Sequence, residues 1–78
     1  MRNKIYVSVR ADHLHDGKVI PRMFRLSADD PPIVIDKLLA VTKAGNTEAF
    51  SDGLRYICRV EGKEVHLYCS KGLWFILT

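Results

Sequence analysis

The chain opens with an alternation of apolar and polar positions. The run reads Ile5-Tyr6-Val7-Ser8-Val9-Arg10. A period of two is typical of a strand with one buried face. The dipeptide Asp16-Gly17 follows, and it supplies the positive φ angles that a two-residue hairpin turn needs. The pattern therefore predicts an N-terminal β-hairpin whose second strand runs from Lys18 to about Leu26.

The register of this hairpin follows from its apolar positions. A turn centred on Asp16-Gly17 places Val9 opposite Phe24, so that the apolar faces of both strands coincide. A slip of one residue would move Phe24 to the polar face. Pro21 has no N–H to donate to a ladder, so it predicts an edge position or a β-bulge near the hairpin end.

The middle of the chain admits two interpretations. Residues 33–44 fit a helix with Asp30 as its N-cap, Pro31 at its first position and Gly45 as its stop. They also fit strands, because Ile33-Val34-Ile35 is a β-branched run. Both interpretations stay open, and the β-branched run tips the balance towards strands.

The last 25 residues carry three alternating apolar runs. These are Leu54–Val60, Glu64–Cys69 and Leu73–Leu77. Each connection contains a glycine, Gly62 or Gly72, which can adopt the left-handed conformation of a short hairpin loop. The spacing predicts a three-stranded antiparallel meander.

The faces of this meander depend on the length of its second loop. If residues 70–72 form a three-residue loop, Tyr68 lies opposite Trp74, and His66 lies opposite Ile76. The predicted core face then contains Tyr56, Cys58, Val60, Val65, Leu67, Cys69, Leu73, Phe75 and Leu77. The predicted second face contains Arg55, Ile57, Arg59, Glu64, His66, Tyr68, Trp74 and Ile76.

These elements predict a mainly β fold in one small domain over residues 1–78. We expect a small antiparallel barrel or a curled sheet of five to six strands, because closure protects strand edges. It combines the N-terminal hairpin and the C-terminal meander, with one helix at 33–44 as the alternative. A chain of 78 residues buries only roughly 60–65% of the surface that its unfolded form exposes, which leaves little room for a large pocket.

The C-terminal region resembles a group of known sequences. The motifs that carry the likeness are Arg-Tyr-Ile-Cys-Arg-Val at 55–60, Leu67-Tyr68 and Trp74-Phe75. The pattern is similar to that of small bacterial β-rich proteins that contain a domain of unknown function, and it covers about a third of the chain. The resemblance implies a β-rich fold and no activity, so it transfers no functional residues.

Charge and targeting signals favour a cytoplasmic protein. Twelve Lys and Arg against nine Asp and Glu give a net charge of +3, which is modest for a dedicated nucleic-acid protein. No secretory signal and no run of roughly 18 apolar residues is found, so we expect neither secretion nor a membrane partner. The two cysteines predict free thiols in a reducing compartment.

Two groups of His and Cys residues are candidate metal ligands, and neither forms a convincing site. His13 and His15 would project from one face of a strand, but spacing identifies no third or fourth ligand. Cys58 and Cys69 fall on the core face of the meander and His66 on the other, so these three cannot converge without a β-bulge. We therefore expect no metal and no other cofactor, with His13 and His15 as the weak metal candidates.

The sequence gives no support for an enzyme. It contains no phosphate-binding loop, no dinucleotide fingerprint and no metalloprotease motif. No Ser or Cys has a His-plus-acid partner that the sequence suggests.

The second face of the meander is the predicted binding surface. Its candidate binding residues are Arg55, Arg59, His66, Tyr68 and Trp74. The favoured hypothesis is a non-catalytic protein-interaction module that binds a protein partner or a second copy through the Tyr68/Trp74 face. The alternative is single-stranded nucleic acid, because bases stack on aromatic rings at roughly 1–3 kcal/mol each while arginines neutralise phosphates.

Overall fold

The N-terminal hairpin forms as the alternation predicts. The computed structural model describes residues 3–43 and 53–77, and in it β1 (Lys4–His13) pairs antiparallel with β2 (Val19–Arg25). Val9 lies opposite Phe24, which confirms the predicted register at the centre of the hairpin.

The hairpin loop differs from the predicted two-residue turn. The N–H of Leu14 donates to the carbonyl of Lys18 at 2.8 Å, so the loop has three residues and ends on Gly17 at φ 92°. The pairing near the loop is therefore one residue out of step with the pairing around Val9. A register shift between Arg10 and Ala11, opposite Pro21, compensates for this one-residue difference, so that Val9 still lies opposite Phe24. The irregularity that Pro21 predicts is confirmed.

Residues 33–43 form strands, so the helix alternative for 33–44 is wrong. The predicted helix stop, Gly45, lies outside the described residues. The two strands are β3 (Ile33–Val34) and β4 (Lys37–Lys43). Between them, the N–H of Ile35 donates to the carbonyl of Arg22 on β2, and the N–H of Asp36 donates to the carbonyl of Arg59. Consecutive backbone donors that reach two different strands are incompatible with a helical ladder.

The C-terminal meander is confirmed, with a shorter second loop. Its strands are β5 (Leu54–Val60), β6 (Lys63–Ser70) and β7 (Leu73–Leu77). Lys71 and Gly72 both adopt positive φ, 54° and 80°, and make a two-residue turn of the type that matches strand twist.

The shorter loop moves β7 by one residue relative to the predicted register. Tyr68 pairs with Phe75, and Cys69 pairs with Trp74. Because strand side chains alternate in direction, the slip exchanges the two faces of β7. Trp74 therefore faces the core instead of Phe75, and the predicted pairs of Tyr68 with Trp74 and of His66 with Ile76 are wrong.

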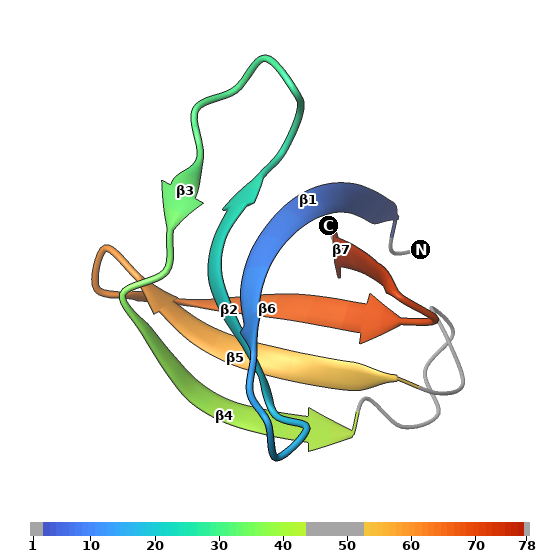
Figure 1. Ribbon diagram of the computed structural model, residues 1–78. Coiled ribbons are helices and arrows are strands. Elements are labelled where there is room, and N and C mark those ends of the chain that lie inside the picture. The colour runs from blue at the N-terminus through green and yellow to red at the C-terminus, as the bar shows by residue number, and fades with distance from the viewer. Residues whose placement is uncertain (1–2, 44–52, 78) are drawn as a thin grey trace.

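All strands belong to one antiparallel sheet in the order β3-β2-β1-β7-β6-β5-β4. The sheet curls into a half-barrel, and the long, bent β1 pairs with β2 along one part and with β7 along the other (Figure 1). The predicted mainly β fold and curled sheet are confirmed. The described residues form seven strands rather than five or six, because residues 33–43 supply two, of two and seven residues.

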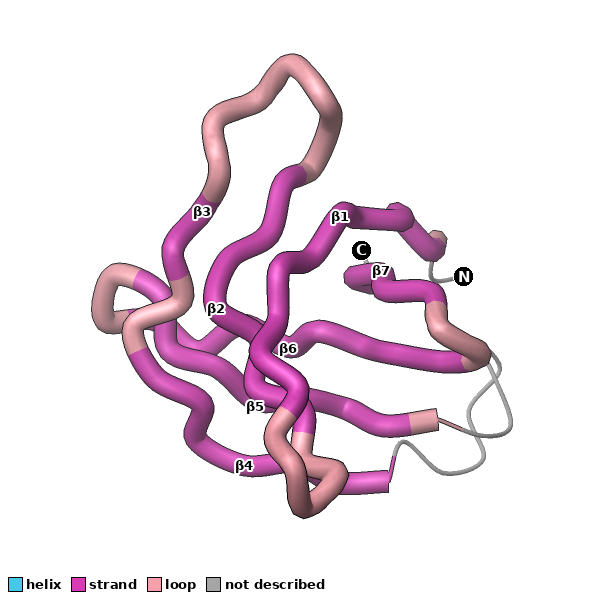
Figure 2. Tube along the Cα trace, viewed as in Figure 1, coloured by secondary structure: helices cyan, strands magenta, loops and turns pink. Residues whose placement is uncertain are grey.

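The strands at the two ends of the sheet, β3 and β4, are neighbours in the chain. Only Ile35 and Asp36 separate them, and short connections link most of the other strands (Figure 2). Residues 3–43 and 53–77 contain no helix with the length and apolar character needed to cross a membrane.

The inner face of the curl holds the hydrophobic core. Its buried residues are Phe24, Ile35, Tyr56, Cys58 and Leu67, with Val7, Val9, Trp74 and Ile76 among the partly buried residues packed against them. We call the opposite side of the sheet the outer face. This face has a smaller cluster of its own, in which Tyr68 and Phe75 are 6% and 1% exposed.

Candidate functional site

Four of the five predicted binding residues share the outer face. Arg55 pairs with Tyr68 across β5 and β6, and its Nε donates to the Thr42 hydroxyl at 3.3 Å. Arg59 is exposed, between Lys37 on one neighbouring strand and Glu64 on the other.

His66 lies on the outer face with Arg55 and Arg59. Its Nε2 is 2.7 Å from a carboxylate oxygen of Glu64, two residues away on the same strand. The imidazole therefore already has a polar neighbour on the sheet surface.

Trp74 does not lie on this face. Its ring is 4.9 Å from the ring of Tyr56, centroid to centroid, and it packs against the core. The predicted Tyr68/Trp74 surface is therefore not present as one face. The physical cause is the left-handed conformation of Lys71, which the sequence alone does not indicate for a lysine.

The aromatic residues of the outer face form a row across three strands. Tyr68 stacks on Phe75 at 5.5 Å with 12° between the ring planes, and Tyr6 meets Phe75 edge-on at 5.8 Å and 64°. Lys4 places its Nζ 4.8 Å from the centroid of Phe75. Tyr68 and Phe75 are covered, whereas Tyr6 is 55% exposed. Tyr6 is therefore the ring of this row that a ligand can reach.

The weak metal candidates lie at the end of the first hairpin. His13 ends β1 and His15 is in the loop, both exposed, and the neighbouring Asp12 is bound by Arg22 at 2.8 Å. Within residues 3–43 and 53–77 no three His, Cys, Asp or Glu side chains gather in a way that could hold a metal ion.

The two cysteines are free thiols on the core side of β5 and β6. Cys58 is fully buried, and burial raises its pKa to about 11. Burial also raises the pKa of Cys69, although a hydrogen bond from the Gly72 backbone partly opposes the shift. A raised pKa keeps a thiol protonated near neutral pH, so neither cysteine has the character of a nucleophile.

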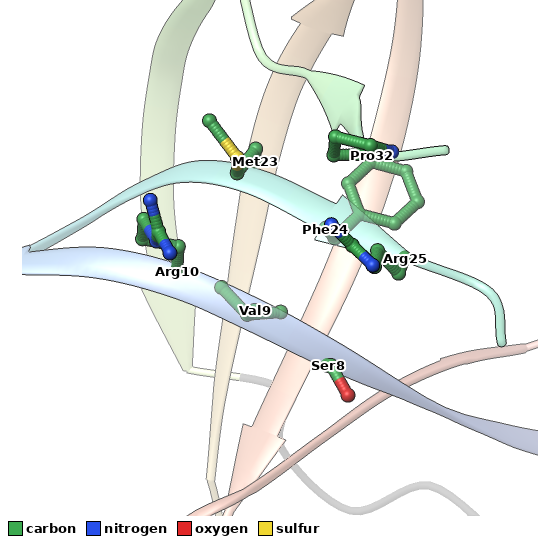
Figure 3. Close-up of a pocket in the computed structure, with 7 residues that line it drawn as sticks. All are labelled: Ser8, Val9, Arg10, Met23, Phe24, Arg25 and Pro32. Carbon is green, nitrogen blue, oxygen red and sulfur yellow. The ribbon is translucent and has the colours of Figure 1, made fainter. Parts of the chain in front are cut away.

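A groove lies over the N-terminal hairpin, outside the predicted binding residues. It has a volume of about 390 Å³ and is lined by Ser8, Val9, Arg10, Met23, Phe24, Arg25 and Pro32. Figure 3 shows Ser8 and Arg10 on β1, Arg25 on the neighbouring β2, and Pro32 from the segment before β3. Val9 and Phe24 belong to the core, so packed apolar residues underlie the groove.

The two arginines of the groove have no acidic partner among the described residues. Arg22, on the same strand as Arg25, is paired with Asp12, but neither Arg10 nor Arg25 forms an ion pair with a carboxylate of residues 3–43 or 53–77. Ser8 lies directly opposite Arg25. Arg10 lies opposite Met23, two residues along β1 from Ser8, so both guanidinium groups line the same groove. An anion bound there can accept charge-assisted hydrogen bonds from them.

The exposed Tyr6 lies on the same strand as two residues of the groove, Ser8 and Arg10. Tyr6, Ser8 and Arg10 project from the same side of the strand, because strand side chains alternate. Successive residues of this set are about 7 Å apart along the strand. We call Tyr6, Ser8, Arg10 and Arg25 the β1–β2 site. It combines an accessible aromatic ring with a hydroxyl and two guanidinium groups.

The sequence contains the signal for this site. The alternation along β1 separates Tyr6, Ser8 and Arg10 from the apolar residues, and the hairpin register puts Arg25 opposite Ser8. Solvated charges on a strand give the same pattern. Only the three-dimensional structure adds the groove and the lack of acidic partners.

Comparison of the chain with known protein families, with curated proteins and with solved structures gives no match.

Proposed function

We propose that this chain is a non-catalytic binding module that binds single-stranded nucleic acid through the β1–β2 site. The observation that carries the proposal is the pair of guanidinium groups of Arg10 and Arg25, which line one groove without an acidic partner among the described residues. The exposed ring of Tyr6 lies on the same side of β1 as Arg10. This is the alternative function that the sequence suggested, at different residues.

The groove would hold the phosphate. Arginine forms charge-assisted hydrogen bonds to phosphate oxygens, and two arginines from neighbouring strands can approach one phosphate from both sides. Ser8 adds a hydroxyl donor opposite Arg25. The net charge of +3 supports attraction of a polyanion at low salt.

Tyr6 would stack on a base. Its ring rests edge-on against Phe75, which is itself stacked on Tyr68. A ring supported by a packed cluster loses little freedom when a ligand stacks on its open side. Stacking is tolerant of base identity, so we expect little sequence preference.

Protein interaction is the competing function for the same surface. An acidic peptide could also place carboxylates between Arg10 and Arg25, but it would make no use of an exposed aromatic ring beside them. The ring therefore favours a nucleobase.

The test is a binding titration with fluorescein-labelled mixed-sequence oligonucleotides of single-stranded DNA and RNA, at several salt concentrations. Removal of both cations in the double variant Arg10→Ala/Arg25→Ala should make the slope of log K against log salt less negative by roughly 0.7, the value for one phosphate neutralised on a single strand. Tyr6→Ala should weaken binding by roughly 1–3 kcal/mol with the salt slope unchanged.

The matched control is Arg59→Ala/Lys63→Ala, which removes the same charge from exposed positions on β5 and β6. This variant should bind almost as well as the unaltered chain. Equal losses in the two double variants would show that binding follows net charge alone and would overturn the site. Binding of polyglutamate in preference to either oligonucleotide would assign the groove to an acidic protein partner.

A further inference from the structure

The last strand of the sheet, β4, offers a second surface. It ends the strand order and pairs only with β5 among the described strands, over seven residues from Lys37 to Lys43. At the other end of the order, β3 has only two residues. Among residues 3–43 and 53–77, β4 is therefore the edge strand long enough to align a further strand along its whole length.

Apolar side chains are exposed along this edge. Leu39, Val41 and the neighbouring Leu54 are 38%, 45% and 38% exposed. An added strand would pair with the backbone of β4 and cover part of these side chains, which is the usual basis of peptide binding by strand addition.

A second copy of the chain fits this edge poorly. The register irregularity between Leu38 and Ala40 inserts one residue in β4, so that Lys37 lies opposite Arg59 and Lys43 lies opposite Leu54, on opposite faces of the sheet. A bulge and charged lysines on an edge strand are the usual protection against pairing with a second copy.

The same charges fit an acidic strand. Lys37 and Lys43 lie at the two ends of β4, and Arg59 lies beside Lys37 on β5. No ion pair with a carboxylate of the described residues engages these three side chains. We propose that the β4 edge binds an extended segment of a partner protein that has apolar residues at its centre and an acidic residue at each end.

The proposed edge is separate from the β1–β2 site, because β7, β6 and β5 lie between β1 and β4 in the sheet. The two surfaces can therefore be tested independently.

The test uses two end-blocked hexapeptides, one with the sequence Glu-Thr-Val-Thr-Val-Glu and one with lysine in place of both glutamates. Six residues match the span of β5 opposite Lys37–Lys43, and their alternation places the two glutamates on opposite faces, as the two lysines are. Each is titrated into the isotope-labelled chain and followed by the amide resonances of residues 37–43. The acidic-ended peptide should bind roughly fourfold or more tightly than the lysine-ended one, given the energies of cross-strand charge pairs. The double variant Lys37→Glu/Lys43→Glu should reverse this preference.

The control variant is Lys63→Glu/Lys71→Glu, which makes the same change of charge at exposed positions near two turns. It should keep the preference for the acidic-ended peptide. The proposal is overturned if neither peptide shifts the β4 resonances at millimolar concentration, or if the preference survives the reversal at residues 37 and 43. Formation of a dimer through β4 would overturn it as well.

Discussion

At the scale of single residues, Cys58 shows how a small core limits chemistry. Its side chain is fully buried in the core, in one cluster with Tyr56 on the same strand and Leu67 on β6. Burial disfavours the charged thiolate and raises the pKa to about 11. A thiol in this position fills space in the core, and near neutral pH it is held in its protonated, weakly nucleophilic form.

The raised pKa of Cys58 predicts a loss of stability at alkaline pH. The folded chain holds this proton more tightly than the unfolded chain does, so the contribution is complete below the ordinary thiol pKa of about 9 and is lost as the pH rises to about 11. At about 1.4 kcal/mol per unit of pKa, the free energy of unfolding should fall by roughly 2–3 kcal/mol from this group.

The measurement is urea denaturation at pH 8, 9, 10 and 11, with Cys58→Ala beside the unaltered chain. The variant should have a lower stability at pH 8 and a shallower fall above pH 9. Cys69→Ala serves as the control, because its partly exposed thiol should contribute a smaller share of the fall. Parallel pH profiles for the unaltered chain and Cys58→Ala would contradict the assignment.

At the scale of elements, the turn between β6 and β7 decides which residues face the core. Lys71 and Gly72 both adopt positive φ, and a cost attaches to this conformation for any residue with a side chain, least for asparagine and aspartate. We infer that the packing of Trp74 against the core stabilises this turn and offsets the backbone strain at Lys71.

This strain predicts opposite effects for two substitutions. Lys71→Asn should raise the free energy of unfolding by roughly 0.5 kcal/mol, because asparagine tolerates the left-handed region. Gly72→Ala should lower it by roughly 1–2 kcal/mol, and the cost is one of backbone conformation alone, since a Cβ added there meets no heavy atom within 4 Å. Chemical denaturation measures both changes. A neutral Gly72→Ala would contradict the observed turn.

The same turn marks the limit of what the sequence could predict. The strand runs of the meander and the pairing of Val9 with Phe24 follow from alternation, and the structure has both. Loop length does not follow from alternation, because residues 70–72 fit a two-residue turn and a three-residue turn equally well.

One residue of difference in that loop reverses β7, so it moved Trp74 out of the predicted binding face and put Phe75 there. The division of 33–43 into two strands was undecided for another reason. It depends on bonds from Ile35 and Asp36 to distant strands, and no local pattern encodes these bonds.

At the scale of the whole molecule, two residues join the ends of the sheet. Ile35 is bonded to β2 and Asp36 to β5, so the chain crosses from one end of the strand order to the other at this point. A carboxylate oxygen of Asp36 also accepts the N–H of Glu61 at 2.8 Å. This contact holds the crossover against the turn between β5 and β6.

Loss of the Asp36 carboxylate should therefore weaken the closure of the half-barrel. Asp36→Ala should lower the free energy of unfolding by about 1 kcal/mol, the usual net value of one hydrogen bond, and Asp36→Asn should lose less because its amide oxygen can still accept. Thermal or urea denaturation measures both. The control is Asp30→Ala in an exposed loop, which should change stability by less than about 0.5 kcal/mol. Equal effects of Asp36→Ala and Asp30→Ala would exclude the proposed role.

The ladder between β1 and β7 has a consequence for how the chain folds. It pairs Lys4 with Leu77, whereas the hairpin and the meander each form from neighbouring residues. The hairpin and the meander join into one sheet only when this ladder forms, and its formation closes a loop that spans nearly the whole chain. The entropy cost of closing a loop grows with its length. The folding rate should therefore depend mainly on how fast these two distant strands meet.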